Sequence, residues 1–306
     1  MPIDATCQVE TRIELDEFLD AVAPLSSALG DEETLLRLAP KIRQLANNRD
    51  FLADRMLAYL AHGSDSRQAA GFDVAFDAYT SHVMLIHLDR EREFVVRANI
   101  WPSAKDYAYK VNSERVFSYN YPHDHGFSFL TVGYLGPGYV SDYYEVDPDK
   151  IVGYPGEQVE MRFIERSQLT QGRSLVYRAH RDVHVQFPPE SMSVSLNLFG
   201  NGLVASIADQ YIFDVQARRI EKVVNPTAIG VLASLALEFG GARARDYVDE
   251  IARLHPVDSV RLEAIKGLAR TGDQATREGL IRLCETSGSH YLSQYGRRCV
   301  EALGVE

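Results

Sequence analysis

The chain has 306 residues, of which 45% are hydrophobic and 25% are charged, as in an ordinary folded globular protein. Its formal net charge is −11. This argues against nucleic acid as a partner, because affinity for phosphates comes from clustered cations. The sequence contains neither a run near the ~18 consecutive apolar residues of a membrane span nor a basic-then-apolar leader. With three unpatterned cysteines as well, we expect a cytoplasmic protein with reduced thiols and no membrane contact.

Residues 1–65 carry apolar side chains at helical spacing. Phe18 and Val22 share one helix face, and the same period continues through Leu35 and Leu38. Asp31 precedes two glutamates, which is typical of a helix start. The pattern predicts an N-terminal segment of two or three amphipathic helices that pack on the domain that follows.

Residues 66–224 change to the period of two that is typical of strands, with Gly- and Pro-rich turns at 136–138 and 188–189. Many short strands at regular spacing predict an antiparallel sandwich or barrel. The expected strands are 82–88, 94–101, 115–121, 127–135, 139–146, 158–164, 174–178, 183–187, 192–199 and 210–215.

Residues 225–306 are helical again in pattern. The segment Asp258–Ala269 recurs loosely as Arg298–Gly304, and this resembles the helix pairs of HEAT-type repeats over fewer than two units. A plain helical bundle is the alternative. In either case we expect these helices to lean on the barrel and to offer a surface for a protein partner or for a second copy in a homodimer.

Two histidines, His123 and His125, are separated by a single residue within the strand-rich zone. Residues two apart on a strand point to the same face, so these imidazoles would point together, with Asp124 pointing away. Buried imidazoles need partners for their nitrogens, and a metal ion provides one. A third ligand would come from a distant strand, where His184 is preferred and His180 is the alternative. Two surface histidines at a strand end are the other interpretation of the pair.

The segment Tyr121–Gly133 resembles the first cupin motif, and Gly172–Leu198 resembles the second. The glutamate that most cupins carry four or five residues after the second histidine is replaced here by Phe129 and Leu130. The pattern therefore resembles the three-histidine thiol dioxygenases, such as cysteine dioxygenase. This resemblance implies an α+β fold around a central antiparallel cupin β-barrel (jelly roll), with Fe(II) on three histidines. Arg178 to His180 departs from the usual Pro-x-Gly, so the substrate is not carried over.

Ligand type alone does not select the metal, and Zn, Mn, Ni and Cu are the alternatives to Fe(II). The first hypothesis is a mononuclear non-haem iron oxygenase of the dioxygenase type, which acts on a small molecule, such as an amino acid, and O₂. The second is a metal-dependent cupin isomerase, lyase or hydrolase. The third is a non-catalytic sensor or scaffold that binds a metal or ligand.

Several side chains near the expected metal site are candidates for chemistry. Arg97, if it points inward, would hold a substrate carboxylate, and the alternative is a surface ion pair. Tyr119 and Tyr121 share the parity of the histidine pair and are candidate hydroxyl donors. The expected substrate pocket consists of Asn99, Trp101 and Gln186. Core packing is the alternative role for each aromatic residue, and Tyr143 and Tyr144 are expected on a surface strand.

Overall fold

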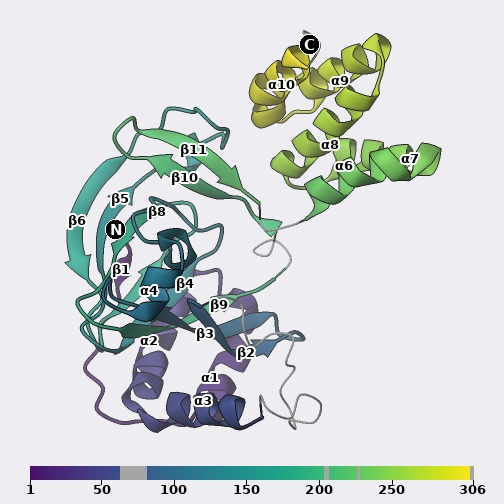
Figure 1. The fold of residues 1–306 in the computed structure, drawn as a ribbon. Helices are drawn as coiled ribbons and strands as arrows, with labels where there is room; N and C mark the ends of the chain where they lie inside the picture. Colours follow the sequence, from purple (N-terminus) through teal and green to yellow (C-terminus); the bar gives the residue numbers. More distant parts are fainter. Residues whose placement is uncertain (63–80, 203–206, 226–227, 304–306) are drawn as a thin grey trace. The chain divides into compact units, whose positions relative to one another are not determined.

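The chain folds into two compact units. The computed structural model describes residues 1–62, 81–202, 207–225 and 228–303. The units consist of Met1–Asp147 with Glu160–Ala205, and of Pro148–Val159 with Ser206–Glu306 (Figure 1). This division differs from the three segments expected at 1–65, 66–224 and 225–306. The N-terminal helices share a unit with the sheets, and the last hairpin groups with the C-terminal helices.

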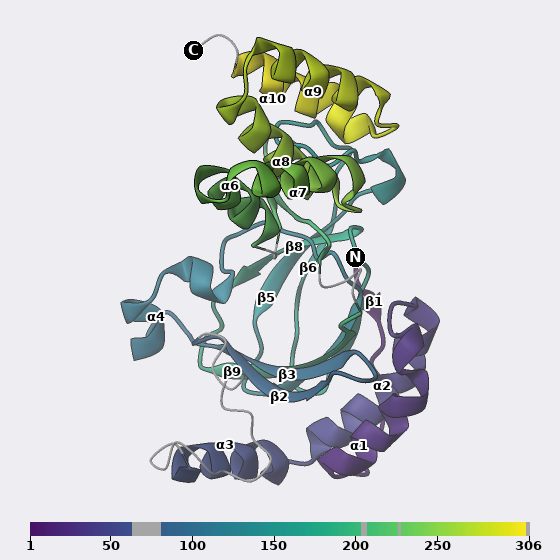
Figure 2. The ribbon, with the colours of Figure 1, turned by 90° about the vertical axis from the view of Figure 1, so that its right-hand side faces the viewer.

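Two antiparallel sheets face each other in the first unit (Figure 2). The larger sheet has the order β1 (Ile3–Asp4), β7 (Ser174–Tyr177), β4 (Phe129–Leu135), β9 (Ser193–Gly200), β3 (Phe94–Trp101) and β2 (Val83–Asp89). The smaller sheet has the order β6 (Arg162–Gln168), β5 (Val140–Glu145) and β8 (Asp182–Phe187). The expected mixture of helices with antiparallel strands is confirmed. Within the described residues, the strands pair as separate sheets, so the pairing does not establish the closed barrel that the sequence led us to expect.

The six-stranded sheet is buried on both faces. Side chains alternate along a strand, and on β3 Phe94 and Val96 belong to one hydrophobic cluster while Val95 and Trp101 belong to another. The first cluster contains the N-terminal helices, and the second contains residues of the smaller sheet. We call the face that carries Val95 and Trp101 the inner face of the sheet.

Three helices cover the opposite, outer face: α1 (Leu15–Val22), α2 (Glu32–Asn47) and α3 (Asp50–His62) (Figure 2). The apolar residues of α1 and α2 recur every three or four positions, so one side of each of these two helices faces the sheet, and α3 joins them through Phe51 and Leu52. On α2 this side includes Leu38 and Ile42, both buried against the sheet. The predicted N-terminal helices are therefore confirmed.

The predicted strand at 115–121 is wrong. Glu114–Phe117 forms a 3₁₀ helix instead, and the side chain of Ser113 accepts the backbone N–H of Arg115 at its start. Ser118 and Asn120 adopt positive φ angles of 56° and 55°, which turn the chain and prevent an extended strand. The alternation of polar and apolar residues carried no sign of these left-handed positions.

The second unit combines the hairpin β10 (Gln210–Asp214) and β11 (Arg219–Val224) with a helical segment. Its helices are α6 (Ile229–Phe239), α7 (Gly241–Leu254), α8 (Asp258–Thr271), α9 (Gln274–Thr286) and α10 (Arg297–Ala302), with a π-helical turn at Leu292–Gly296. They share one hydrophobic core, in which Leu262, Ile265 and Leu292 are buried. No helix in the described ranges is both long and apolar enough to cross a membrane. The likeness to HEAT-type pairs stays a prediction.

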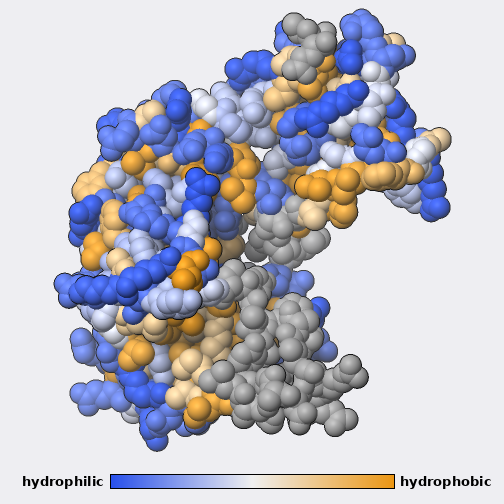
Figure 3. Space-filling model, viewed as in Figure 1, coloured by the Kyte–Doolittle hydropathy of each residue, from blue (hydrophilic) through white to orange (hydrophobic). Residues whose placement is uncertain are grey.

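Hydrophobic side chains lie exposed along α6 and α7 (Figure 3). Val231 is 65% exposed and Phe239 is 84% exposed, and Leu254 of α7 is similarly open. Such side chains are compatible with the surface that we expect to meet a partner or a second copy. That interaction stays a prediction.

An excursion between β5 and β6 supplies part of the second unit. In this segment, Pro148–Val159, Val152 and Tyr154 pack against the helical core, and the Tyr154 ring stacks on Tyr295 with a centroid separation of 5.5 Å. The carboxylate of Glu157 accepts the backbone N–H of Val152 at 2.8 Å and holds the turn together. The second unit is thus built from two separate stretches of sequence.

Replacement of Leu38 by Ala should lower the free energy of unfolding of the first unit by about 2–5 kcal/mol, because it opens a cavity under the sheet. Leu38 is 2% exposed, whereas Leu36 of the same helix is 37% exposed. The matched control Leu36→Ala should change stability by less than about 0.5 kcal/mol. Trp101, the single tryptophan, reports on this unit by fluorescence during denaturation. Equal effects of the two variants would contradict the packing described.

Candidate metal centre

The structure brings together His123, His125 and His184. Each offers one ring nitrogen, and these nitrogens lie within 4.8 Å of one another. His184 lies in the middle of β8, and His123 pairs with it as an isolated antiparallel bridge, with backbone N–O distances of 3.1 and 2.9 Å. Two segments far apart in sequence therefore meet at one point, and this triad could bind a metal ion.

The backbone at His123 and His125 differs from the regular strand that the His-x-His spacing predicts. Residues 121–128 are irregular, and only His123 forms a β-bridge. The ring centroids are 4.4 Å apart for His123 and His184, and 5.1 Å apart from His125 to each of the other two. Three imidazoles thus pack against one another inside the unit.

The chemistry of the three rings fits a metal ion. The Nδ1 of His123 lies 2.7 Å from the backbone oxygen of Tyr121. As an N–H donor to that carbonyl, it would leave Nε2 of His123 as the ligand atom. Among the residues that the structure describes, the buried Nε2 of His184 and Nδ1 of His125 have no hydrogen-bond partner. An ion would satisfy nitrogens of this kind, which are otherwise costly to bury.

Electrostatics favour the neutral rings that bind metals. Burial lowers the pKa of His123, and burial together with the neighbouring histidines lowers the pKa of His125. Burial and the proximity of His123 also lower the pKa of His184. The cluster of possible ligands within the described residues holds histidines only. Phe129 occupies one of the two positions where most cupins would carry the glutamate, and its ring lies 4.9 Å from the His125 ring.

His180, the alternative third ligand, has a different environment. Its φ angle of 54° lies in the left-handed region and turns the chain just before β8, so it does not share a strand face with His184. Its Nδ1 lies 3.0 Å from the carboxylate of the fully buried Asp124, and its backbone N–H donates to the carbonyl of His125 at 2.9 Å. His180 and Asp124 therefore brace the loop that carries the histidine pair.

The three side chains predicted for catalysis lie in different surroundings. Arg97 lies on the inner face of β3, with its guanidinium 4.9 Å from the Phe199 ring centroid. Tyr119 is buried and donates its hydroxyl to the carbonyl of Pro102 at 2.8 Å. The ring of Tyr121 lies 6.5 Å from that of His123. Their catalytic roles stay predictions.

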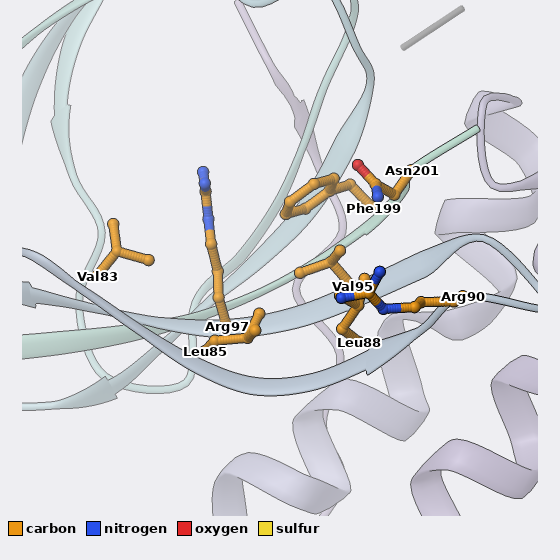
Figure 4. Close-up of a pocket in the computed structure, with 8 residues that line it drawn as sticks. All are labelled: Val83, Leu85, Leu88, Arg90, Val95, Arg97, Phe199 and Asn201. Carbon is orange, nitrogen blue, oxygen red and sulfur yellow. The ribbon is translucent and has the colours of Figure 1, made fainter. Parts of the chain in front are cut away.

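A cavity of about 220 Å³ opens beside Arg97, over strands β2 and β3 (Figure 4). Figure 4 shows Arg97 and Phe199 projecting on the same side of the sheet. The lining residues are Val83, Leu85, Leu88, Arg90, Val95, Arg97, Phe199 and Asn201. The cavity thus combines apolar walls with cationic groups, which suits a small organic anion.

The side chains expected to form the substrate pocket are all buried. Trp101 donates its indole N–H to Ser195 Oγ at 3.0 Å. The Nδ2 of Asn99 lies 3.4 Å from Nε2 of His82. Gln186, on β8, forms an isolated bridge with Tyr119.

Sequence reasoning missed a tyrosine pair beside the site. The Tyr177 ring lies 4.9 Å from the His184 ring, and its hydroxyl lies 3.0 Å from that of Tyr143. Burial raises the pKa of Tyr177 well above its ordinary value, so the hydroxyl keeps its proton. The expectation that Tyr143 and Tyr144 both lie on a surface strand is wrong for Tyr143. The strand alternates, and Tyr143 pairs with His184 in the register of β5 with β8.

No family model and no curated protein matches this chain. A cupin-like protein from Thermotoga maritima is 8% identical, with 43% of this chain and 74% of that chain covered and a TM-score of 0.23. Hydroquinone 1,2-dioxygenase in complex with Cd²⁺ and 4-hydroxybenzonitrile is 12% identical, with 39% of this chain and 64% of that chain covered and a TM-score of 0.25. A DMSP lyase from Ruegeria pomeroyi is 10% identical, with 49% of this chain and 64% of that chain covered and a TM-score of 0.24. Cupin proteins are thus among its structural neighbours, but likeness at these TM-scores carries no argument about activity.

Replacement of His184 by Ala should abolish stoichiometric metal binding, whereas His180→Ala should retain the ion. The reason is that His184 offers a ligand nitrogen and His180 acts on the loop through Asp124. Loss of such an outer contact typically weakens metal affinity by about 10- to 100-fold without removing a ligand. The measurement is metal content by mass spectrometry after purification without a histidine tag. An empty His180→Ala protein beside a loaded His184→Ala protein would reverse the assignment.

Proposed function

We propose that the protein is a cupin-type oxygenase that uses Fe(II) and O₂ to oxidise a small carboxylate-bearing molecule, such as an amino acid. The observation that carries the proposal is the convergence of three neutral imidazoles, from His123, His125 and His184, without a carboxylate in the cluster of described residues. Three protein ligands leave coordination positions open for small molecules. The resemblance of the two sequence motifs to three-histidine dioxygenases supports iron as the first choice.

Iron held by the three histidines would supply open coordination positions and redox chemistry. The protein's own residues would bind and orient the substrate. Arg97 would hold the carboxylate from the inner face of β3, because a guanidinium matches a carboxylate with two parallel hydrogen bonds. Tyr177 would keep a proton at its hydroxyl beside His184, supported by Tyr143. The ring of Phe129 packs on His125 and would help to exclude water there.

A redox-inert reaction is the second candidate, because the same donor set also suits zinc and other divalent ions. A lyase, isomerase or hydrolase would use the ion as a Lewis acid, with the protonated hydroxyl of Tyr177 as a hydrogen-bond donor. A sensor without catalysis would bind its ligand and leave it unchanged. The metal that supports turnover separates these candidates.

Protein loaded with Fe(II) should consume O₂ when a panel of small amino and organic acids is added, and protein loaded with Zn(II) should not. The reason is that only the iron form can donate electrons to O₂. The measurement is oxygen uptake with an electrode, together with product detection by mass spectrometry. Conversion of a substrate without O₂ in the zinc form would replace the oxygenase proposal by the lyase, isomerase or hydrolase alternative.

Substitution of Arg97 by Met should raise the KM for a carboxylate substrate by about 10- to 150-fold, which corresponds to about 1.5–3 kcal/mol for hydrogen bonds to a charged group. Arg97→Lys should restore only part of the affinity, because an ammonium lacks the planar fork. Arg90 also lines the cavity but is exposed, so Arg90→Met is the control and should have little effect. Steady-state kinetics would measure this, and equal losses at Arg90 and Arg97 would argue against a clamp at Arg97.

A further inference from the structure

A polar strip crosses the inner face of the six-stranded sheet. Arg97 of β3 pairs in register with Asn197 of β9, which in turn pairs with Thr131 of β4. Side chains directly opposite on neighbouring strands point to the same face, with Cβ atoms about 4.5–5.5 Å apart. Arg97 projects into the cavity (Figure 4). By the pairing register, Asn197 and Thr131 continue the same row across the sheet.

The two new members of this strip are buried and lack partners. Thr131 is 1% exposed and Asn197 is 2% exposed. Among the residues that the structure describes, the hydroxyl of Thr131 and the Nδ2 of Asn197 make no hydrogen bond. Buried polar groups that serve the fold are normally paired, and unpaired ones are costly. A ligand that supplies an acceptor to Asn197 would offset this cost.

The strip lies next to the candidate metal centre. The adjacent row on the same face contains Phe199 opposite Phe129, and the Phe129 ring lies 4.9 Å from the His125 ring. Arg97 lies over the ring of Phe199 in the same cavity. One aromatic row therefore separates the strip from the histidines, which is within the span of a small organic molecule.

Unpaired acceptors lie on both sheets of the same unit. Within the described part of the chain, Asn99 Oδ1 and Gln186 Oε1 are buried without a hydrogen-bond donor. Asn99 follows Arg97 by two residues on β3, and Gln186 follows His184 by two residues on β8, so each shares a face with a residue of the site. A complementary ligand brings an acceptor for the strip and a donor for these oxygens.

We propose that Thr131 and Asn197, together with Arg97, form a recognition subsite for a small organic acid that also carries a hydroxyl or ammonium group. Its carboxylate would bind Arg97, Asn197 and the hydroxyl of Thr131, and its hydroxyl or ammonium hydrogens would reach the oxygens of Asn99 or Gln186. That this acid is a substrate rests on the proposed function. Its binding requires no turnover.

The ligand test uses three acids of equal carbon number: butyrate, 2-hydroxybutyrate and 2-aminobutyrate. Titration calorimetry on metal-free and on zinc-loaded protein should show that the hydroxy or the amino acid binds at least 10-fold more tightly than butyrate. The tighter of the two identifies the donor group. Failure of all three acids to bind, or equal affinity for all three, would overturn the subsite.

The variant test separates recognition from structure. Thr131→Val and Asn197→Leu remove unpartnered polar atoms at nearly constant volume, so the unfolding midpoint should stay unchanged or rise. The affinity for the preferred acid should fall about 10-fold or more in each variant. Thr131→Ser, which keeps the hydroxyl, should bind nearly as the parent does. A lower midpoint in both apolar variants, or undiminished binding, would contradict the proposal.

Ser195 provides a matched control on the same strand and face. Its Oγ accepts the indole N–H of Trp101, so it is a paired polar group, unlike Asn197. Ser195→Ala should lower the unfolding midpoint. If zinc-loaded protein binds the acid but the iron form takes up no O₂, the subsite proposal is supported and the oxygenase proposal is contradicted. If the iron form takes up O₂ and the Thr131→Val and Asn197→Leu variants bind the acid as the parent does, the oxygenase proposal is supported and the subsite proposal is contradicted.

Discussion

Burial of the six-stranded sheet on both faces is the constraint on which the rest of the first unit depends. The outer face is apolar and meets the N-terminal helices, so hydrophobic burial holds that layer in place. The inner face meets the smaller sheet and carries arginine, asparagine and threonine beside aromatic rings. Because water is largely excluded there, each of these polar groups needs a partner within the unit or from a ligand.

The histidines experience the same constraint in a stronger form. His123, His125 and His184 are held neutral by burial, with their rings packed on one another and on aromatic neighbours. The backbone bridge between His123 and His184 fixes two of the rings, and the contact of Asp124 with His180 steadies the loop that carries the third. Rigid backbone and uncharged rings together make a preorganised set of donors. The stability lost to buried nitrogens would be regained when an ion binds.

The sequence predicted which histidines come together better than it predicted their local backbone geometry. The spacing of His123 and His125, and a third histidine in a distant strand, were visible because they depend on residue type and local period. Tyr177 was not visible, because its proximity to His184 arises from how the strands of two sheets pack against each other. The turn at His180 was also hidden, since a left-handed φ at a residue other than glycine leaves no reliable mark in the sequence.

The polar strip was hidden for a related reason. Asn197 and Thr131 are unremarkable within β9 and β4, and only the register of those strands with β3 places them beside Arg97. Pairing register is a non-local property, so a single sequence with short strands determines it weakly. Arg97, by contrast, can be recognised in the sequence, because a cation within an apolar strand stands out without knowledge of its neighbours.

The excursion at Pro148–Val159 has a consequence for the order in which the protein can be assembled. During synthesis, Val152 and Tyr154 leave the ribosome well before the helices whose core they complete. Strands β6 to β9 are synthesised between these residues and the helices, so the second unit cannot complete its core until the first unit has been synthesised. A fragment that starts at Ser206 would lack these residues and the turn held by Glu157. The natural cut between the units is therefore not a single position in the chain.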